Sequence, residues 1–270
     1  MQQGRVLIIA GSDPSGGAGI QADIKTVTAL GGYASAAITA LTAQNTKGVF
    51  DTFEVPHEFI KKQISLVLED IGADCIKTGM LHNAKVVESV AQVLEKHGNI
   101  SLVVDPVMVA TSGDSLLDNK DAVSAIKEIL VPKATLVTAN IPEAEILSGV
   151  RVTDVDSMIK AGKKIVSAGA KNVLVKGGHM DDDVVQDILI LGDGTLGKIY
   201  EHTRVYTNNT HGTGCTLASA IACGLAKGGS MQHCIGKARE YVYDAIRTAP
   251  GFGKGHGPLN HCCWIEKSAS

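Results

Sequence analysis

The sequence predicts an α/β protein built on a mainly parallel sheet, and three observations favour this fold class. Short apolar runs such as "RVLIIA" and "SLVVDP" alternate with longer amphipathic stretches such as "NAKVVESVAQVLEKH". The amphipathic stretches stand between most of the apolar runs, which is the order of βαβ units. Polar residues and glycines follow the apolar runs, as at the turns between strands and helices. We expect a single domain of three layers, with helices on both faces of the sheet.

Six apolar runs are predicted to be strands, and three amphipathic stretches are predicted to be helices between them. The strands cover residues 5–10, 36–43, 74–79, 101–106, 135–140 and 172–178, and the helices cover residues 57–71, 83–97 and 121–131. Two later runs, residues 184–193 and 197–207, have no helical stretch between them and carry "GDG" at their junction. This pattern predicts a β-hairpin, which we place near one edge of the sheet.

Composition and charge argue against several classes of partner. The 270 residues carry a formal net charge of −3 and 4% aromatic residues, which gives little basis for binding nucleic acid. The N-terminal "MQQGRVLIIAGSD" lacks a cationic leader, and no apolar run approaches the length that crosses a bilayer. The six cysteines form no CxxC pair, which favours neither a zinc site nor a disulfide framework. We expect a cytoplasmic protein that acts on a small molecule, without nucleic acid or membrane partners.

Chemically distinctive residues follow the predicted strands. Because open parallel sheets bind ligands at the carboxyl edge of their strands, we expect these residues to meet at one site. Ordinary turns are the alternative interpretation. The residues are Gly11, Ser12 and Asp13 after the first strand, then Gln44 and Asn45, Thr78, Gly79 and Met80, Asp105, Asn140, and Lys176 after the sixth.

The stretch "THGTGC", residues 210–215, comes directly before an almost wholly apolar helical pattern. The first N–H groups of a helix have no partner inside the helix, and the helix dipole is positive there. Gly212, Thr213, Gly214 and Cys215 are therefore predicted to bind an anion through backbone N–H groups. The alternative is a tight turn that only lets the helix pack on the sheet.

Three side chains add the remaining requirements of phosphoryl transfer. Asp105 and Glu143 could hold Mg²⁺ directly or through water, and Lys176 could place a positive charge on a phosphate. Each also has an ordinary explanation: a strand-end cap for Asp105, a favoured acid in a first helical turn for Glu143, and a surface lysine for Lys176. Together with the anion-binding stretch they favour a kinase.

Two other nucleotide-binding motifs fit the chain poorly. "GAGIQA" at residues 17–22 matches the dinucleotide fingerprint, but its first glycine stands well beyond the end of the first strand. The second strand ends in Gln44 rather than in an acid that could hold a ribose. A P-loop is absent from the sequence, since no Gly-Lys is followed by Ser or Thr.

The order of these motifs resembles the ribokinase superfamily and, within it, the vitamin kinases that phosphorylate hydroxymethylpyrimidine and its monophosphate in thiamine synthesis. The resemblance spans residues 10–261. Its motifs are "AGSDPSGGAGIQADIKT", "TALTAQNT", "KTGML", "VVDPVM", "NIPEAEIL", "VKGGH", "THGTGCTLASAIA" and "GKGHGPLNH".

The resemblance implies a single ribokinase-like kinase domain, which we place at residues 1–262 with a C-terminal tail at 263–270. It implies ATP and Mg²⁺ as cofactors, the pyrimidine alcohol and then its monophosphate as substrates, and a homodimer. Carried over residue by residue, Asp23 would bind the acceptor hydroxyl and Gln44 the aminopyrimidine edge. The ring pocket would take Gly11, Ala18, Met80 and Val107, and the phosphates and metal would take Asn140, Glu143, Lys176 and the anion-binding glycines Gly212 and Gly214.

Cys215 stands where the sugar kinases of this superfamily carry an aspartate base, as in the vitamin kinases. A helix N-terminus lowers the pKa of a thiol, so the sulfur is expected to accept a proton or a hydrogen bond. The alternative is that Cys215 serves through its backbone N–H and as a pocket wall, because a loose phosphoryl transition state depends mainly on position and charge.

Two other functions remain open at this stage. Pyridoxal also carries a hydroxymethyl group on a nitrogen heterocycle, so a pyridoxal kinase is the alternative within the same branch. A nucleotide-binding regulator without catalysis is a second alternative. Such a regulator should lack the metal-binding acids, the lysine or the anion-binding loop, and all three are present in the sequence.

Overall fold

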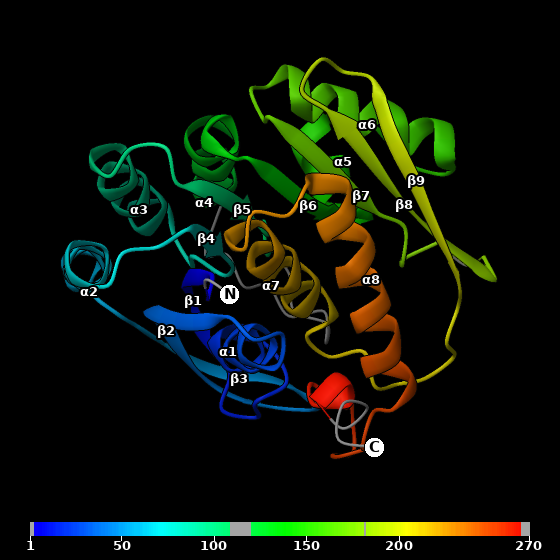
Figure 1. Ribbon diagram of the computed structural model, residues 1–270, viewed down its shortest axis with the longest axis horizontal. Coiled ribbons are helices and arrows are strands. Elements are labelled where there is room, and N and C mark those ends of the chain that lie inside the picture. Colours follow the sequence, from blue (N-terminus) through cyan, green and yellow to red (C-terminus); the bar gives the residue numbers. More distant parts are fainter. Residues whose placement is uncertain (1–2, 109–119, 181, 266–270) are drawn as a thin grey trace.

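The computed structural model describes residues 3–108, 120–180 and 182–265, and within these ranges the chain forms one nine-stranded sheet between two layers of helices (Figure 1). The strand order is β3-β2-β1-β4-β5-β6-β7-β8-β9. Strands β2, β1, β4, β5, β6 and β7 run parallel, while β3, β8 and β9 pair antiparallel at the two edges.

The bounds of the elements follow. The strands are β1 Arg5–Ser12, β2 Tyr33–Asn45, β3 Gly48–Glu54, β4 Cys75–Thr78, β5 Ser101–Val104, β6 Leu136–Asn140, β7 Asn172–Lys176, β8 Val184–Leu191 and β9 Leu196–Thr203. The helices are α1 Gly19–Ala29, α2 His57–Asp70, α3 Ala84–Lys96, α4 Lys120–Ala125, α5 Ile141–Ser148, α6 Val155–Ser167, α7 Thr213–Ala226 and α8 Met231–Arg247.

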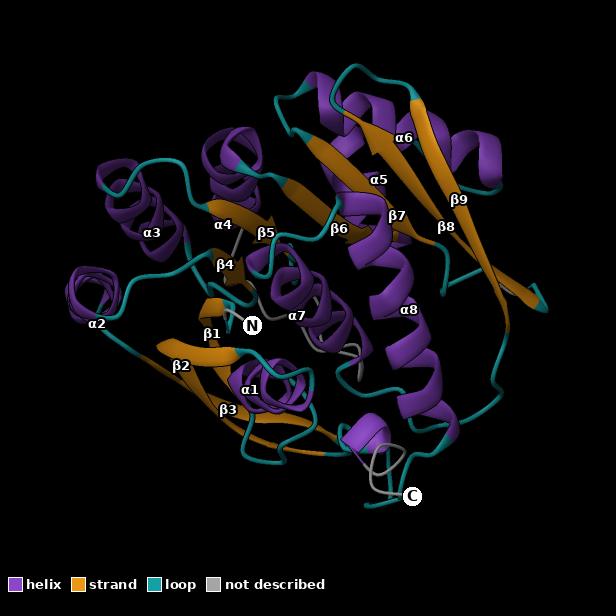
Figure 2. Ribbon diagram, viewed as in Figure 1, coloured by secondary structure: helices purple, strands orange, loops and turns teal. Residues whose placement is uncertain are grey.

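Alternate residues of each central strand face opposite helix layers. In β1, Leu7 and Ile9 belong to the apolar core under α2, α3, α5 and α6, whereas Val6 and Ile8 belong to the core under α1, α7 and α8. Figure 2 shows these two helix layers on either side of the strands. Since side chains alternate across a strand, a central strand with both faces covered must be apolar throughout, as β1 is.

The predicted α/β class, the mainly parallel sheet and the edge hairpin of β8 and β9 are confirmed. Strand β3, which pairs antiparallel with β2 at the other edge, was not predicted from the sequence. Its segment "GVFDTFE" has neither a continuous apolar run nor a glycine-rich turn pair, and its Phe50 and Phe53 are 69% and 68% exposed. A strand whose large apolar residues face outward gives no clear signal of burial.

The packed part of the chain extends past the domain boundary expected at residue 262. Cys263 is buried in the core beside α8. The rings of Trp264 and Tyr241 pack edge to face, with their centroids 5.4 Å apart. Trp264 Nε1 donates to Asp244 Oδ2 at 2.9 Å. Residues 266–270 of the expected tail lie outside the described residues.

The parallel strands reverse their order between β1 and β4. From β1 the chain crosses to β2 on one side, and from β4 onward it builds the sheet on the other side. Such a reversal opens a crevice at the carboxyl ends of the strands, where open α/β sheets bind ligands. Helix α7 packs across β1, β4, β5 and β6, so its first turn lies near this edge.

None of the helices in the described ranges combines the length and the apolar character needed to cross a membrane.

Burial of one face of α2 gives the first prediction. Ile64 is 0% exposed and Leu66 is 57% exposed on the same helix. Replacing Ile64 by Ala should lower the free energy of unfolding by about 2–5 kcal/mol, because it removes packed methyl groups and leaves a cavity. Leu66→Ala is the control and should change it by about 0.5 kcal/mol or less. Urea unfolding followed by circular dichroism measures both, and equal losses would contradict the packing of α2.

Candidate active site

A cavity of about 600 Å³ lies along the carboxyl ends of the parallel strands and reaches to α8. Asp23, Asn45, Thr78 and Gly79 do not line it, although the sequence placed them at the site. The expected residues that line it are Gly11, Ala18, Gln44, Met80, Asp105, Val107, Asn140, Glu143, Lys176, Gly212, Thr213, Gly214 and Cys215. Side chains from six separate strand ends and one helix start therefore meet in a single space, as the parallel topology predicts.

The start of α7 is shaped by Gly212. This residue has a φ of 80°, in the left-handed region that favours glycine, and a Cβ there would overlap the carbonyl oxygen of Gly17. Thr213 begins the helix, and its hydroxyl donates to the Thr210 carbonyl at 2.7 Å. The following N–H groups belong to the first helical turn, where no carbonyl of the same helix can accept from them. They give this end of the cavity a partial positive charge.

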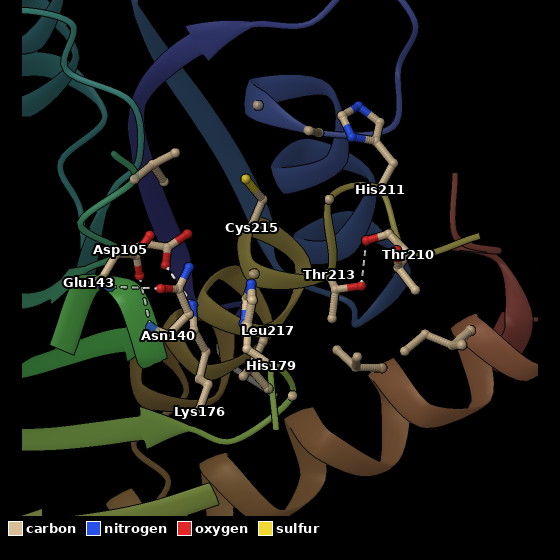
Figure 3. A pocket seen from close by; sticks show the side chains of 18 of the residues that line it. Asp105, Asn140, Glu143, Lys176, His179, Thr210, His211, Thr213, Cys215 and Leu217 are labelled. Carbon is tan, nitrogen blue, oxygen red and sulfur yellow. Dashed lines mark hydrogen bonds and ion pairs between the residues drawn. The ribbon is translucent and has the colours of Figure 1, made fainter. Parts of the chain in front are cut away.

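Lys176 and Asp105 stand directly in front of this helix start (Figure 3). Lys176 Nζ lies 3.1 Å from Asp105 Oδ1, which also accepts from the Thr138 hydroxyl at 3.1 Å. A Cβ on Gly214 would lie 3.3 Å from Lys176 Nζ and 3.6 Å from Asp105 Oδ2. The glycine thus leaves room for a positive side chain beside the backbone donors, which is the charge arrangement that a phosphate needs.

Asn140 and Glu143 join the same wall through the start of α5. The Asn140 side chain accepts from Glu143 N at 2.9 Å, and the Glu143 carboxylate accepts from Asn140 N at 2.8 Å. This reciprocal cap fixes the direction of both side chains. Burial raises the pKa of Glu143 to about 7, although the Lys176 ammonium opposes that effect.

The carboxylate oxygens on this wall suit a Mg²⁺ ion that is bound in part through water molecules. In the ranges that the structure describes, no group of three or more His, Cys, Asp or Glu side chains could hold a metal ion. Mg²⁺ commonly keeps several waters and takes one or two carboxylates together with phosphates of the substrate. Asp105 and Glu143 provide two carboxylates. The two groups lie close enough together for the charge of Asp105 to raise the pKa of Glu143.

The other end of the cavity carries an amide and a thioether. Gln44, near the end of β2, lies with its Nε2 3.4 Å from His211 Nε2. Met80 follows β4, and a Cβ on Gly11 would overlap its methyl group. Gly11 therefore makes space for the Met80 side chain at the cavity wall.

His211 and Asp13 form a buried pair behind Gln44. His211 Nε2 lies 2.8 Å from Asp13 Oδ2, and both side chains are less than one tenth exposed. Burial would raise the pKa of Asp13, but hydrogen bonds from His211 and Ser15 outweigh it and hold the pKa below its usual value. The structure thus gives His211 a structural partner and also places it on the cavity wall.

The expected contact of Asp23 with substrate is wrong for this structure. Asp23 is fully buried on the inner face of α1, and its two carboxylate oxygens each lie 2.9 Å from Lys77 Nζ. Ser219 donates to it at 2.7 Å. Burial favours the neutral amine of Lys77, but the Asp23 carboxylate outweighs this effect and raises the pKa of Lys77. Asp23 therefore neutralises a buried cation and does not line the cavity.

The expected lowering of the Cys215 pKa is also wrong. Burial raises the pKa of the thiol to about 12, and the nearby Lys77 ammonium only partly opposes it. Burial removes water from the sulfur and so disfavours the thiolate, and the charges of Asp23 and Asp105 act in the same direction. At neutral pH Cys215 is a protonated thiol at the cavity wall.

Several residues in the part of the cavity that reaches α8 were not predicted from the sequence as site residues. Only His179 belongs to a compact motif, "VKGGH". The set comes from the segment after β7, from β8, from β9 and the loop after it, and from α8. One feature of the sequence pointed to a buried charge in this region: Arg239 lies within an apolar face of α8, and a charged residue in such a place needs a buried partner. In the structure Arg239 Nε donates to Asp187 Oδ2 at 2.7 Å. The residues are His179, Asp187, His202, Arg204, Val205, Arg239, Val242, Tyr243 and Ile246.

The sheet order, with a lysine and two carboxylates in one cavity beside the start of α7, is that of a ribokinase-like kinase. A family model described as phosphomethylpyrimidine kinase matches residues 13–260. The chain belongs to this phosphomethylpyrimidine kinase family.

Two relatives illustrate the range of the family. The chain is 43% identical to a hydroxymethylpyrimidine/phosphomethylpyrimidine kinase of Bacillus subtilis, over 98% of this chain and 97% of the relative. It is 49% identical to a thiamine biosynthesis bifunctional protein of Geobacter sulfurreducens, over 98% of this chain. The chain spans about half of that longer protein, 53% of its length.

Solved structures of two kinds share the fold. An ADP complex of Bacillus subtilis pyridoxal kinase matches with a TM-score of 0.89 and 33% identity, covering 98% of this chain and 100% of that one. The phosphomethylpyrimidine kinase of Clostridium difficile 630 matches with a TM-score of 0.79 and 41% identity, covering 90% of this chain and 99% of that one. Backbone similarity therefore extends to both kinds of kinase, while identity is higher with the pyrimidine kinase.

The raised pKa of Cys215 predicts how the thiol behaves. Because the sulfur is protonated over pH 6–9, Cys215→Ala should lower kcat by less than about tenfold and leave the shape of its pH profile unchanged. A coupled assay of ATP consumption across that range measures both. If Cys215→Ala removes an ionisation from the pH profile and lowers kcat by on the order of 100-fold, the sulfur acts as a thiolate base after all.

Proposed function

We propose that this chain transfers the γ-phosphoryl group of ATP to the hydroxymethyl group of 4-amino-5-hydroxymethyl-2-methylpyrimidine, and then a second one to the resulting monophosphate. The observation that carries the proposal is a single cavity with an amide and a thioether at one end and a lysine beside an anion-binding helix start at the other. The names of the pyrimidine kinases in the same family support it.

Charge and position supply most of the catalysis in this proposal. In the first transfer the acceptor oxygen bonds to the γ-phosphorus, the bond from that phosphorus to the bridging oxygen breaks and ADP leaves, and the hydroxyl proton passes to water. Backbone N–H groups at Gly214 and Cys215 and the ammonium of Lys176 stabilise negative charge on the transferring group. Mg²⁺ bound by Asp105, Glu143 and water would neutralise further charge on the phosphates.

Gln44 suits the ring of the proposed substrate. An amide can donate to a ring nitrogen and accept from an exocyclic amino group at the same time. Met80 offers a polarizable surface to the face of a heterocycle. Both side chains line the cavity, and Thr42 Oγ1 donates to Gln44 Oε1 at 3.1 Å.

Pyridoxal kinase is the second candidate, because structures of pyridoxal kinases match this fold with TM-scores up to 0.89. One of them, from Staphylococcus aureus, is bound to AMP-PCP and pyridoxal. Pyridoxal presents a phenolic oxygen and an aldehyde where the pyrimidine presents an amino group, so the two substrates make different demands on Gln44. A regulator without catalysis is less well supported, since the lysine, both carboxylates and the anion-binding loop share one cavity.

We also propose a homodimer in the cytoplasm, where ATP is available. Apolar side chains on the β2–β3 edge and on α2 support an interface between two copies, since exposed patches of this kind mark contact surfaces. These are Leu41, Phe50, Phe53, Phe59 and Leu66, each more than 40% exposed. Sedimentation would test the state of association.

A steady-state assay of the purified chain tests the proposed function. ATP consumption is measured with the pyrimidine alcohol, its monophosphate and pyridoxal in parallel, with and without Mg²⁺. We expect turnover of both pyrimidines and a lower kcat/KM for pyridoxal. A higher kcat/KM for pyridoxal would make the second candidate the function.

Replacing Gln44 tests the ring subsite. Gln44→Leu should weaken binding of the pyrimidine by about 1–3 kcal/mol, because it leaves the amino group of the ring without a partner in a largely buried site. The affinity for ATP should hardly change, since the nucleotide end of the cavity is built from other strands. Isothermal titration calorimetry with each ligand measures both affinities. Loss of ATP binding with retention of pyrimidine binding would contradict the placement of Gln44.

Replacing Gly214 tests the anion-binding helix start. Gly214→Val puts a branched side chain against Lys176 and between the backbone donors and the phosphate, so kcat should fall by about 100-fold to 1,000-fold. Gly236→Val in α8, where a Cβ makes an ordinary contact with Tyr200, is the control for a β-branched residue in a helix. Circular dichroism confirms folding and a coupled assay gives kcat. A folded Gly214→Val protein with normal kcat would mean that the glycines serve only helix packing.

A further inference from the structure

Residues 253–258, "GKGHGP", form a segment that we call the strap, and the proposed reaction gives it no role. Its N-terminal half is hydrogen-bonded to the turn between β2 and β3. The backbone N–H groups of Lys254 and Gly255 each donate to the Thr46 hydroxyl at 3.2 Å. His256 N donates to the Thr46 carbonyl at 2.7 Å. Three consecutive backbone donors of the strap therefore hold one threonine, which lies two residues after Gln44.

The C-terminal half of the strap grips the loop that leads into α7. Gly257 N donates to the Asn208 carbonyl at 3.2 Å, and His211 N donates to the Gly257 carbonyl at 3.1 Å. His211 and Pro258 form a parallel bridge. The strap therefore connects the turn beside Gln44 with the residue directly before the Gly212 anion-binding start.

The glycines of the strap permit this close approach. A Cβ on Gly255 would overlap the Thr46 carbonyl oxygen, and a Cβ on Gly257 would overlap the Asn209 side chain. Since real Cβ atoms do not make such contacts, any side chain at either position must push the strap away from its partner. The spacing of glycine at alternate positions thus matches the two surfaces that the strap touches.

The turn beside Gln44 needs such support. Strand β1 pairs with β2 only as far as Leu41, and in the part of the chain that the structure describes the continuation of β2 through Asn45 pairs with β3 alone. The pairing of β2 with β3 is also irregular between Ala43 and Gln44. An isolated two-stranded hairpin is at best marginally stable in water, so a third partner is required to fix its end. The strap is that partner, and in Figure 1 the C-terminal part of the chain lies at the end of the β2–β3 hairpin.

We infer that the strap is a positioning device which holds the ring-binding Gln44 and the anion-binding loop at a fixed separation, and that Thr46 is its positioning residue. The inference rests on the proposed function, since it concerns the distance between the ring and the transferred phosphoryl group. Substrate affinity then depends on preorganisation of the hairpin end, because a mobile Gln44 must be ordered when the ring binds. The nucleotide site depends on the strap only through the anion-binding loop, because Lys176 lies on β7 and Asp105 directly follows β5, both away from the sheet edges.

Four variants separate positioning from general structure. Thr46→Val keeps the shape of the side chain and removes the hydroxyl that accepts from the strap, while Thr46→Ser keeps the hydroxyl. Gly255→Ala keeps Thr46 and displaces the strap. Thr52→Val makes the same chemical change on β3 of the same hairpin, directly across from Thr42, and serves as the matched control.

The expected result is a split between the two substrates. Thr46→Val and Gly255→Ala should raise the KM for the pyrimidine by about tenfold, with a smaller rise in the KM for ATP and the thermal midpoint of unfolding nearly unchanged. Thr46→Ser and Thr52→Val should resemble the unmodified chain. Amide hydrogen exchange, which needs no turnover, should become about tenfold faster in Thr46→Val for both residues 42–48 and residues 208–212.

Two results would overturn the inference: Thr46→Val that matches Thr52→Val in both KM and exchange, or Thr46→Ser that is as impaired as Thr46→Val. Failure of the proposed function is distinguishable from both. If the unmodified chain does not turn over the pyrimidine, the proposed function fails, while coupled exchange of the two segments still decides whether the strap joins them.

Discussion

The close approach of two glycines at the start of α7 is the constraint on which the site depends. Gly212 takes a left-handed conformation with its α-carbon close to the Gly17 carbonyl, which leaves no room for a side chain. This contact directs the first turn of α7 towards the carboxyl edge of the sheet. There, Lys176 Nζ lies 3.1 Å from Asp105 Oδ1. Backbone donors can approach a phosphate closely only where no side chain intervenes, so the glycines and the anion-binding chemistry require one another.

Two Lys–Asp pairs neutralise the buried charges near the cavity, one in the core and one at the cavity wall. Lys77 and Asp23 neutralise each other in the core below Cys215, and Lys176 and Asp105 do so at the cavity wall. A buried charge without a partner is very costly, so each lysine needs its acid even before any ligand arrives. The side chains of the outer pair are 13% and 2% exposed, whereas the inner pair is fully buried. Only the outer pair can meet a ligand, which is why the proposed function gives the phosphate contact to Lys176 and not to Lys77.

The family relationship and the fold answer different questions. Solved structures of a pyridoxal kinase and of a phosphomethylpyrimidine kinase both match this chain, so the backbone fold does not by itself distinguish the two kinds of kinase. In the proposed function, selectivity would come from the part of the cavity that carries Gln44 and Met80. That end lies on a hairpin that extends past its parallel neighbour and is held by the strap, so loop contacts rather than the central sheet would set which ring is accepted.

The sequence by itself determined the alternation of strands and helices, the edge hairpin of β8 and β9, and most of the residues that meet in the cavity. These follow from periodicity and from the rule that ligands bind at the carboxyl ends of parallel strands, both of which are local or topological. Strand β3, the burial of Asp23 by Lys77, the protonated state of Cys215 and the α8 end of the cavity were decided only by the tertiary structure. Each of these depends on which residues distant in the chain exclude water from a group, and neither spacing nor composition encodes that exclusion.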